Sequence, residues 1–450
     1  MLICILKFLR RSILSTDWCR FDYYAKRLRS FGLLYRPSAI YGIILGSEVW
    51  RVLRLSRPLV PLCPSLRHLS WCTWVDHDPL PLDHVLSLVG PQICRLHLEV
   101  KASDLAETSS IRSIPVICPR ITHLPTYFYY YDNLPEESGH FREIVSEIVC
   151  CYQLVDFSFN LSVSQRALLH LAGMPALHKL ALNVSSSDDF ISLSLPRSAF
   201  PALRDLDLTG KMASAFLEAL PSCKLEAIRV VFESTTNEGN IMTRFFQVLH
   251  ECCSHQSLSR IGVHFEPNFM QPHHPDIEAY MLQPLLSFVN LQDITISIHH
   301  KFEINNNFVE VAAKSWPRLR SLKLGFDGWG SCRWGGRSNI TLTGLASLAR
   351  HCPDLTSLAI VIDATVVDHV LDIPVSNTKL NVLHLGDSII QNPTSVAACL
   401  SRIFPYLTSI YSWQFSVFQA EEKTKKKYCD RWDEVARLIK ISADVQNGKK

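Results

Sequence analysis

A short apolar pattern, L-x-x-L-x-L, recurs along the chain at spacings of 22 to 36 residues. In each copy the fourth and sixth positions point to one side of an extended backbone, so each copy predicts a short strand with one buried face. Proline precedes many copies by one or two residues, as at Pro175, Pro201 and Pro317, and favours a turn into the strand. Thirteen copies begin at Leu66, Ile93, Ile121, Leu154, Leu177, Leu203, Leu225, Leu258, Leu291, Leu319, Leu355, Leu380 and Leu407, with a weaker fourteenth at Leu28.

Segments with helical periodicity lie between these strands, each with its apolar residues on one face. They span residues 141–151, 164–172, 213–220, 241–252, 277–288, 308–315, 341–350 and 394–403. A strand followed by a helix, repeated with a period of this length, is the signature of leucine-rich repeats. The sequence therefore predicts an α/β leucine-rich-repeat solenoid, with a parallel inner sheet, outer helices and thirteen or fourteen degenerate repeats.

The two ends differ from the repeats and predict caps for an otherwise open core. Residues 1–27 read as an N-terminal helical cap, with Ser15-Thr16-Asp17 as the capping residues. Residues 28–415 form the solenoid, and residues 416–450 form a C-terminal capping helix and basic tail. In that tail Trp432, Val435, Ala436, Leu438 and Ile439 share one helical face, and the basic run 423–427 reads as a solvated turn before the helix. The alternatives for the run are a nuclear address and a patch for an anionic surface.

Three stretches interrupt the array and predict loops. Residues 127–140 are aromatic and then acidic, residues 266–275 are rich in proline and polar residues, and residues 325–339 are rich in glycine and tryptophan. Long loops often carry function, so an enzyme with its site in residues 325–339 stands as an alternative to a binding protein.

Composition narrows the functional class. The 450 residues include 45 basic and 42 acidic side chains, which give a net charge of +3. A charge this close to zero does not indicate the basic surface that binds nucleic acid. The apolar stretch 1–9 is too short to span a membrane and lacks the features of a signal peptide. Fifteen scattered cysteines suit free thiols in a reduced compartment. We therefore expect a monomeric protein of the cytoplasm or nucleus, with no membrane or nucleic-acid partner.

The sequence offers no catalytic, cofactor-binding or metal-binding constellation, and we expect the chain not to be an enzyme and to need no cofactor. The pairs His273-His274, His299-His300, Cys150-Cys151 and Cys252-Cys253 lack the spacing of metal ligands. Gly325-x-x-Gly328-x-Gly330 lacks the spacing of a phosphate-binding loop and a helix directly after it.

Binding is expected on the concave face, where the third and fifth positions of each copy point outward, with the seventh beside them. The charges there are mixed, which suits a protein ligand better than a nucleic acid. These positions hold His68 and Ser70, Arg95 and His97, His123 and Pro125, Asp156 and Ser158, Lys179 and Ala181, Asp205 and Asp207, Ala227 and Arg229, Arg260 and Gly262, Asp293 and Thr295, Ser321 and Lys323, Ser357 and Ala359, Val382 and His384, and Ser409 and Tyr411.

Residues 16–30, TDWCRFDYYAKRLRS, resemble the linker of fungal F-box/leucine-rich-repeat proteins, D-W-x-R-F-x-x-Y-A-x-R-V-R-x-L. The matching residues are Asp17, Trp18, Arg20, Phe21, Tyr24, Ala25, Arg27 and Arg29, and Leu28 replaces the valine. The degenerate repeats after this linker look like those of the same family, so the resemblance covers nearly the whole chain.

The resemblance implies a non-catalytic protein-interaction module, namely a substrate-recognition domain related to receptors of cullin-type (SCF) ubiquitin ligases. In that family an F-box ahead of the linker docks on a Skp adaptor and usually opens on a Leu-Pro pair, which residues 1–15 lack. We therefore expect the Skp adaptor as a partner only if an F-box is present upstream. The alternatives are a free-standing leucine-rich-repeat scaffold and a truncated gene model that lacks its F-box.

Overall fold

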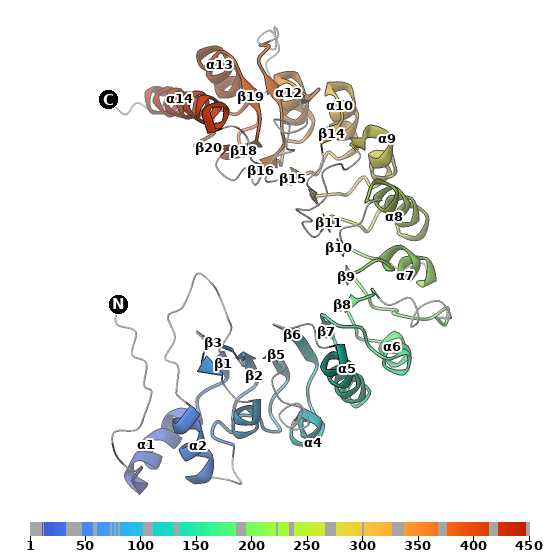
Figure 1. Cartoon of the computed structure of the whole chain (residues 1–450), viewed down its shortest axis with the longest axis vertical. Coiled ribbons are helices and arrows are strands. Elements are labelled where there is room, and N and C mark those ends of the chain that lie inside the picture. The colour runs from blue at the N-terminus through green and yellow to red at the C-terminus, as the bar shows by residue number, and fades with distance from the viewer. Residues whose placement is uncertain are drawn as a thin grey trace. The chain divides into compact units, whose positions relative to one another are not determined.

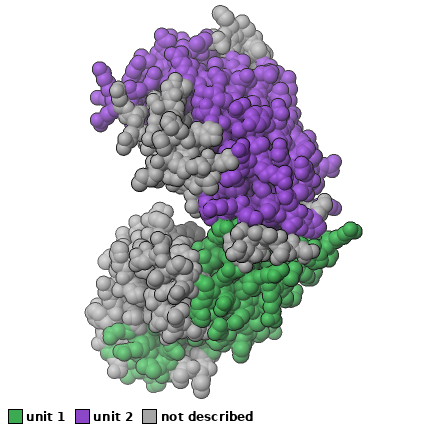
Figure 2. Space-filling model, turned by 45° about the vertical axis from the view of Figure 1, so that its right-hand side comes forward, with its two compact units in different colours: residues 1–209 green, residues 210–450 purple. Residues whose placement is uncertain are grey.

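The computed structural model describes the chain in stretches that form two compact units, residues 1–209 and 210–450 (Figure 2). The described residues are 11, 13–32, 47–56, 61–72, 74–75, 78–79, 82–101, 111–129, 135–185, 195–221, 224–233, 238–265, 276–298, 301–325, 337–367, 376–413 and 422–446. Each unit is an α/β array in which helices line one face of a parallel sheet (Figure 1).

Unit 1 builds its sheet from strands that pair in chain order, each parallel to the one before it. The strands are β1 (Ser30–Gly32), β2 (His68–Cys72), β5 (Arg95–Lys101), β6 (His123–Tyr129), β7 (Asp156–Phe159), β8 (Lys179–Asn183) and β9 (Asp205–Thr209). The helical segments are α1 (Ser15–Ala25), α2 (Ser47–Ser56), η1 (Leu82–Ser87), η2 (Ile111–Ser113), α4 (Ile114–Ile117), α5 (Pro135–Val149) and α6 (Gln165–Ala172). The short strands β3 (Trp74–Val75) and β4 (Asp78–Pro79) form an antiparallel pair.

Unit 2 repeats this plan and ends in a long helix. Its sheet contains β10 (Ala227–Phe232), β11 (Arg260–Phe265), β13 (Asp293–Ser297), β15 (Ser321–Leu324), β16 (Ser357–Ala359), β18 (Val382–Gly386) and β20 (Ser409–Ser412). The helical segments are α7 (Ala213–Ala219), α8 (Glu238–Cys252), α9 (Ala279–Leu282), η3 (Gln283–Ser287), α10 (Asn306–Ser315), α12 (Leu342–His351), α13 (Pro393–Ile403) and α14 (Glu422–Gln446). Two further parallel pairs are β12 (Ile277–Glu278) with β14 (Phe302–Glu303), and β17 (Asp363–Ala364) with β19 (Ile389–Ile390).

The strand register confirms the predicted repeat. In unit 1 the third position of each copy pairs with the third position of the next, from His68 through Arg95 and His123 to Asp156. In unit 2 the same holds from Ala227 through Arg260 to Asp293. The fourth and sixth positions therefore stack into apolar rows, which are buried in nearly every copy. Full burial of such a side chain contributes about 1.5–3 kcal/mol, so the stacked rows are the main source of cohesion between repeats.

Several helices begin where the sequence supplies a cap for the first unpaired backbone N–H groups. Ser164 Oγ accepts a hydrogen bond from Ala167 N, and Asn305 Oδ1 accepts one from Phe308 N. Asn392 caps α13 in the same way. At α1 the N-cap is Leu14, so the predicted capping residues Ser15 to Asp17 form the first turn, and Asp17 accepts a hydrogen bond from the backbone N–H of Leu14.

Two predictions of local structure were wrong, and a proline lies at the point of difference in each. Residues 277–288 were expected to form one helix, but α9 ends at Leu282 and a 3-10 helix containing Pro284 follows. Proline lacks the N–H that an α-helix needs and clashes with the preceding turn. Residues 127–140 were expected to be a loop, but β6 continues to Tyr129 and α5 already begins at Pro135. Proline is favourable in the first turn of a helix, where its missing N–H costs nothing.

The C-terminal helix confirms the predicted apolar face but corrects the reading of the basic run. Trp432, Val435 and Ile439 are buried, and α14 packs against α13 and β20. Trp432 Nε1 donates a hydrogen bond to Ser388 O at 2.9 Å, while the Trp413 ring stacks on Tyr428. Residues 423–427 belong to the first turns of α14 and are not a turn ahead of it.

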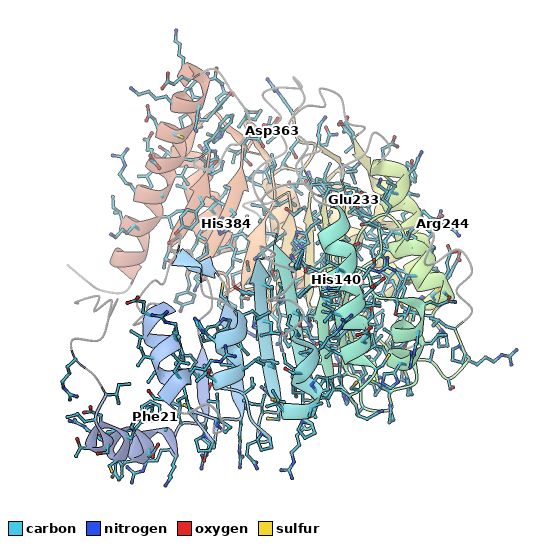
Figure 3. The ribbon with its side chains drawn as sticks, turned by 60° about the horizontal axis from the view of Figure 1, so that its bottom comes forward. Phe21, His140, Glu233, Arg244, Asp363 and His384 are labelled. Atoms are coloured by element: carbon cyan, nitrogen blue, oxygen red, sulfur yellow. The ribbon has the colours of Figure 1, made fainter. Side chains whose placement is uncertain are left out.

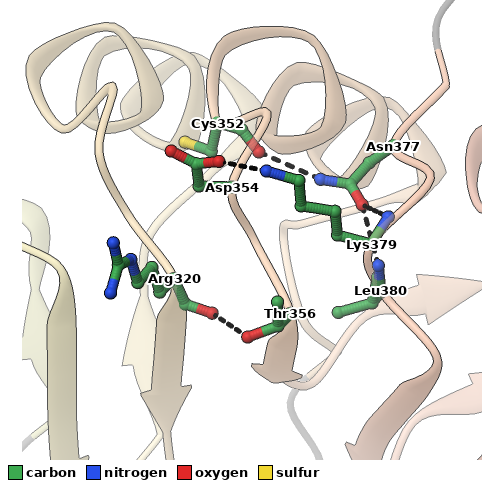
Figure 4. A network of polar contacts seen from close by, with 7 residues as sticks. All are labelled: Arg320, Cys352, Asp354, Thr356, Asn377, Lys379 and Leu380. Carbon is green, nitrogen blue, oxygen red and sulfur yellow. Dashed lines mark hydrogen bonds and ion pairs between the residues drawn. The ribbon is translucent and has the colours of Figure 1, made fainter.

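A polar ladder that the sequence analysis did not predict links repeats where the strands begin. The second position of several copies carries a hydroxyl or thiol that donates to the backbone carbonyl of the second position of the preceding copy. The pairs are Thr122 Oγ1 to Cys94 O, Ser259 Oγ to Glu226 O, Thr356 Oγ1 to Arg320 O, Thr408 Oγ1 to Asn381 O, and Cys94 Sγ to Arg67 O. Figure 4 shows the pair of Thr356 and Arg320, with a donor–acceptor distance of 3.1 Å.

Asn377 extends this network in unit 2. Its side chain donates to Cys352 O at 3.0 Å and accepts from the backbone N–H groups of Lys379 and Leu380, both at 2.9 Å (Figure 4). Asn377 is buried, so its side chain pairs with backbone groups where little water is available to replace it.

Candidate functional site

The face of the sheet opposite the helices carries the polar positions of every repeat, and we call it the polar face. It consists of the third, fifth and seventh positions of each copy, whose side chains alternate with the buried ones. Most of the predicted third- and fifth-position residues are half-buried or exposed, as expected. Ser158 and Ala359 depart from the expectation, because both are buried. In unit 2, Figure 3 shows His384 on the sheet and Arg244 on helix α8.

The polar face differs in charge between the units. In unit 1 the three positions contribute Arg95 and Lys179 as basic side chains, and Glu99, Asp156, Asp205 and Asp207 as acidic ones. In unit 2 they contribute Arg229, Arg260 and Lys323 as basic side chains, and Asp293 as the acidic one. Binding of a nucleic acid would require a continuous basic surface, and these mixed charges do not form one.

In unit 1 a cluster of titratable residues forms across β5, β6 and β7. His97 Nε2 lies 3.5 Å from Glu99 Oε1 on the same strand, and the His97 ring contacts the Tyr127 ring at a centroid distance of 5.4 Å. The strand register places His123 beside Asp156. Thr122 Oγ1 lies 2.9 Å from His123 Nδ1 and orients that imidazole. The contact of His97 with Tyr127 and the pairing of His123 with Asp156 each join neighbouring repeats, and both depend on the repeats being in register.

Burial governs the protonation of the histidines in this cluster. Desolvation lowers the pKa of His97, although the nearby carboxylates of Glu99 and Asp156 act in the opposite direction. Desolvation also lowers the pKa of His123, and the positive charge of Arg95 adds to this effect. Both imidazoles are therefore neutral at physiological pH.

Unit 2 has its own histidines on the polar face. His384 stacks on Tyr411 with ring centroids 4.8 Å apart and an interplanar angle of 18°. Burial lowers the pKa of His384, and Lys323 lowers it further. At Gly262 an added side chain would come within 3.3 Å of Arg229 Cγ, so glycine leaves room for the arginine stem to lie across the strand.

The seventh position was expected beside the third and fifth, but its residues were not named, and Glu99 and Tyr127 are two of them. Both occupy the seventh position of their copies, and their strands continue beyond the six-residue pattern. Continued alternation of buried and partly exposed residues, as in Leu98, Glu99 and Val100, was the signal that could have identified them.

The residues considered for catalysis or metal binding do not form a chemical centre in the part of the chain that the structure describes. Within those residues no three histidine, cysteine, aspartate or glutamate side chains could hold one metal ion. His273-His274, His299-His300 and residues 326–336 of the glycine-rich stretch lie outside the described residues. The cysteines of the Cys150-Cys151 and Cys252-Cys253 pairs form no disulfide.

Buried thiols elsewhere are poor nucleophiles. Burial raises the pKa of the Cys352 thiol to about 12 and that of Cys63 to about 11, so neither forms a thiolate at neutral pH. No cysteine in the described stretches forms a disulfide, which agrees with the prediction from their scattered pattern. Among the same residues, no helix combines the length and the apolar character that crossing a bilayer requires.

Comparisons with known proteins found a similar solved structure, and no match among family models or curated proteins. Among solved structures, a chain of the crystal structure of the Rad7 and Elc1 complex in yeast is similar, with a TM-score of 0.42 and 14% sequence identity. The likeness covers 90% of this chain and 80% of that chain. The function proposed below rests on the residues of this chain.

Proposed function

We propose that this protein is a non-catalytic interaction module that recognises a protein partner on its polar face. One observation carries the proposal: the strand register aligns the outward positions of successive repeats into continuous rows of half-buried polar side chains. A rigid sheet presents such rows at a spacing that matches an extended or helical protein segment. The mixed charges of the rows favour a protein over a uniformly charged polymer.

The finer proposal is that the partner is a substrate and that the module belongs to a cullin-type ubiquitin ligase. Its support is the linker resemblance around α1. The matching residues there have defined contacts: Asp17 pairs with Arg11, and Trp18 packs edge-on against Phe21 at 5.3 Å. Arg29 Nη1 donates to Lys26 O at 3.0 Å and to Ser65 O at 3.3 Å, joining the linker to the turn before β2.

The recognition proposal is tested by reversing charge on the polar face. Asp205→Lys combined with Asp207→Lys should reduce the affinity for a crosslinked or co-purified partner by about tenfold or more, through repulsion and lost pairing. The free energy of unfolding should change by only about 0.5 kcal/mol, because both side chains point away from the core. Quantitative mass spectrometry of material captured by the wild type and the variant gives the readout.

The matched control reverses two charges away from the polar face. Asp433→Lys combined with Glu434→Lys changes two exposed carboxylates of α14 and should leave capture unchanged. Equal loss of partners in both double variants would point to a general charge effect. Full capture by the polar-face variant would refute recognition at Asp205 and Asp207.

The ligase proposal has a separate test. If the gene encodes an F-box in frame ahead of Met1, the longer product should retain a Skp adaptor in a pulldown, whereas residues 1–450 should not. Retention of the adaptor by residues 1–450 would contradict the expectation that docking needs an upstream F-box. Failure of the longer product to retain it would remove the ligase role and leave the recognition proposal intact.

A further inference from the structure

His123 on β6 lies in a positive electrostatic environment. The strand register places it between Arg95 on β5 and Asp156 on β7, and places His68 of β2 beside Arg95. Burial is the main cause of the lowered pKa of His123, and among the neighbouring charges Arg95 has a larger effect on it than Asp156 has. His68 acts in the same direction as Arg95. A negative charge beside this imidazole would therefore be stabilised.

His97 on β5 lies in the opposite environment. The charges that affect its imidazole are the carboxylates of Glu99 and Asp156, and both act to raise its pKa against the effect of burial. The polar face therefore changes sign between Arg95 and His123 at the third position and the fifth and seventh positions of β5. An acidic group of a partner would be attracted to Arg95 and His123 and repelled from Glu99.

The side chains of Arg95 and His123 can be reached from solvent. Arg95 is exposed and His123 is half-buried. Among the described residues, no acidic side chain forms an ion pair with Arg95. Within the same residues His123 Nε2 has no hydrogen-bond partner, and it is not one of the atoms buried without one. The two side chains therefore offer donors to a group that approaches the polar face.

Thr122 sets the tautomer of His123. Its single hydroxyl hydrogen is donated to Cys94 O at 3.2 Å, so Thr122 Oγ1 accepts the hydrogen bond of 2.9 Å from His123 Nδ1. Nδ1 therefore carries the proton of the neutral imidazole, and Nε2 carries a lone pair. Nε2 becomes an N–H donor only when the ring takes up a second proton. Binding of an anion at Nε2 is therefore coupled to proton uptake.

We propose that Arg95 and His123 receive the carboxylate of an aspartate or glutamate side chain of the protein partner, with uptake of a proton from solvent at His123 Nε2. This inference rests on the proposed function and adds the chemistry of the recognised residue. The guanidinium and the imidazolium both donate charge-assisted hydrogen bonds to the carboxylate. The bound carboxylate raises the pKa of His123 above its value in the free chain, so affinity increases as the pH falls between these two values.

The experiment titrates the full chain, with its histidines isotopically labelled, with a capped tetrapeptide that carries two central glutamates, at constant ionic strength. The imidazole signal of His123, assigned with His123→Gln, should shift in a saturable way, and its titration should move to higher pH. The signal of His250 on α8 should not shift. Between about pH 7.5 and pH 5.5 the dissociation constant should decrease, by at most about tenfold per pH unit for one coupled proton. The same tetrapeptide with two glutamines should not bind.

Variants assign the two roles. Arg95→Gln should weaken binding of the glutamate peptide by about tenfold or more, because it removes a charge-assisted pair. It should also raise the pKa of His123 in the free chain, since the positive charge that lowers it is lost. His123→Gln should bind more weakly and lose most of the pH dependence. Arg166→Gln on α6 removes an exposed arginine of the same unit and is the matched control that should change neither property.

The possible outcomes separate this inference from the proposed function. Equal binding of the glutamate and glutamine peptides by the wild type, or an affinity independent of pH, would overturn the inference even if a variant fails to fold. Saturation by a phosphoserine peptide but not by the glutamate peptide would also overturn it. If the glutamate peptide does not bind but partner capture is lost in the Asp205→Lys and Asp207→Lys variant, recognition on the polar face stands without this contact. Proton-coupled binding that Arg95→Gln abolishes supports the inference, even if the capture experiment fails.

Discussion

At the scale of single residues, the histidines of the polar face link solvent exposure to proton binding. His97, His123, His264 and His384 come from different repeats, yet desolvation is the largest cause of a lowered pKa in all four. Each side chain lies between neighbouring strands and loses water on both sides. The repeat geometry therefore keeps the polar face less positive at neutral pH than a count of its imidazoles suggests.

These shifts predict how stability depends on pH. The usual histidine pKa is 6.5, and the folded value is lower, so the unfolded chain binds protons first as the pH falls. The stabilisation is therefore complete above about pH 6.5 and declines as the pH falls through the folded pKa values. Melting temperatures measured between about pH 7.5 and pH 5 should decrease, and His97→Gln should make the decrease shallower.

The carboxylates act in a different pH window. The Arg11 guanidinium holds the pKa of the Asp17 carboxyl at about 2, and Lys379 lowers that of Asp354. Their contributions decline only below about pH 4, near the ordinary pKa of an acid. A pH slope in His97→Gln equal to that of the wild type, measured above pH 4.5, would contradict the role assigned to His97.

At the scale of elements, the ladder of side-chain hydrogen bonds at the starts of the strands fixes the alignment of each repeat with the repeat before it. Packing of leucines is tolerant of small shifts, whereas a hydrogen bond to a particular carbonyl is not. The apolar rows therefore hold neighbouring repeats together, and the ladder sets their register.

Asn377 and Thr356 provide a graded test of this ladder. Asn377→Ala leaves Cys352 O and two backbone N–H groups without their side-chain partner in a buried site, and should lower the free energy of unfolding by about 2–4 kcal/mol. Thr356→Val removes one bond at an exposed position and should cost at most about 1 kcal/mol. Denaturant unfolding of both variants measures the difference, and equal losses would contradict the distinction by burial.

The strands and most helices could be predicted from the sequence because burial acts directly on the apolar pattern. Leu180 and Leu182 must face the core for any version of the repeat, so their spacing suffices. The 3-10 segment at Pro284 and the early start of α5 at Pro135 depend on how a single proline meets a local turn. The hydrogen bond of Thr356 could not be predicted, because a threonine before a strand is compatible with solvent as well.

The candidate site was predictable only as rows of positions. The third and fifth positions follow from the period, and they include His97 and Asp156. The contact of His97 with Tyr127 and the pairing of Asp156 with His123 depend on the register of strands separated by long connections, which no local pattern encodes. The hydrogen bonds that remain unmade at Asp156 and His97 could be identified only from the folded geometry.

At the scale of the whole molecule, each unit is stabilised by contacts between neighbouring repeats. The described residues contain no group of side chains that could hold a metal ion. Treatment with a strong chelator should therefore leave the melting temperature unchanged. A clear decrease on chelation, reversed by added zinc, would show that residues outside those ranges bind a structural metal. Differential scanning fluorimetry with and without chelator makes the measurement.

The uneven spacing of the repeats has a consequence for how this protein can change over generations. Leu154 and Leu177 are 23 residues apart, and Leu319 and Leu355 are 36 apart, yet both intervals deliver their strands to the same row positions. The difference in repeat length lies in the helices and loops that connect one strand of the sheet to the next. Insertions and deletions there leave the binding rows in place, so partner preference can evolve one strand at a time through point substitutions.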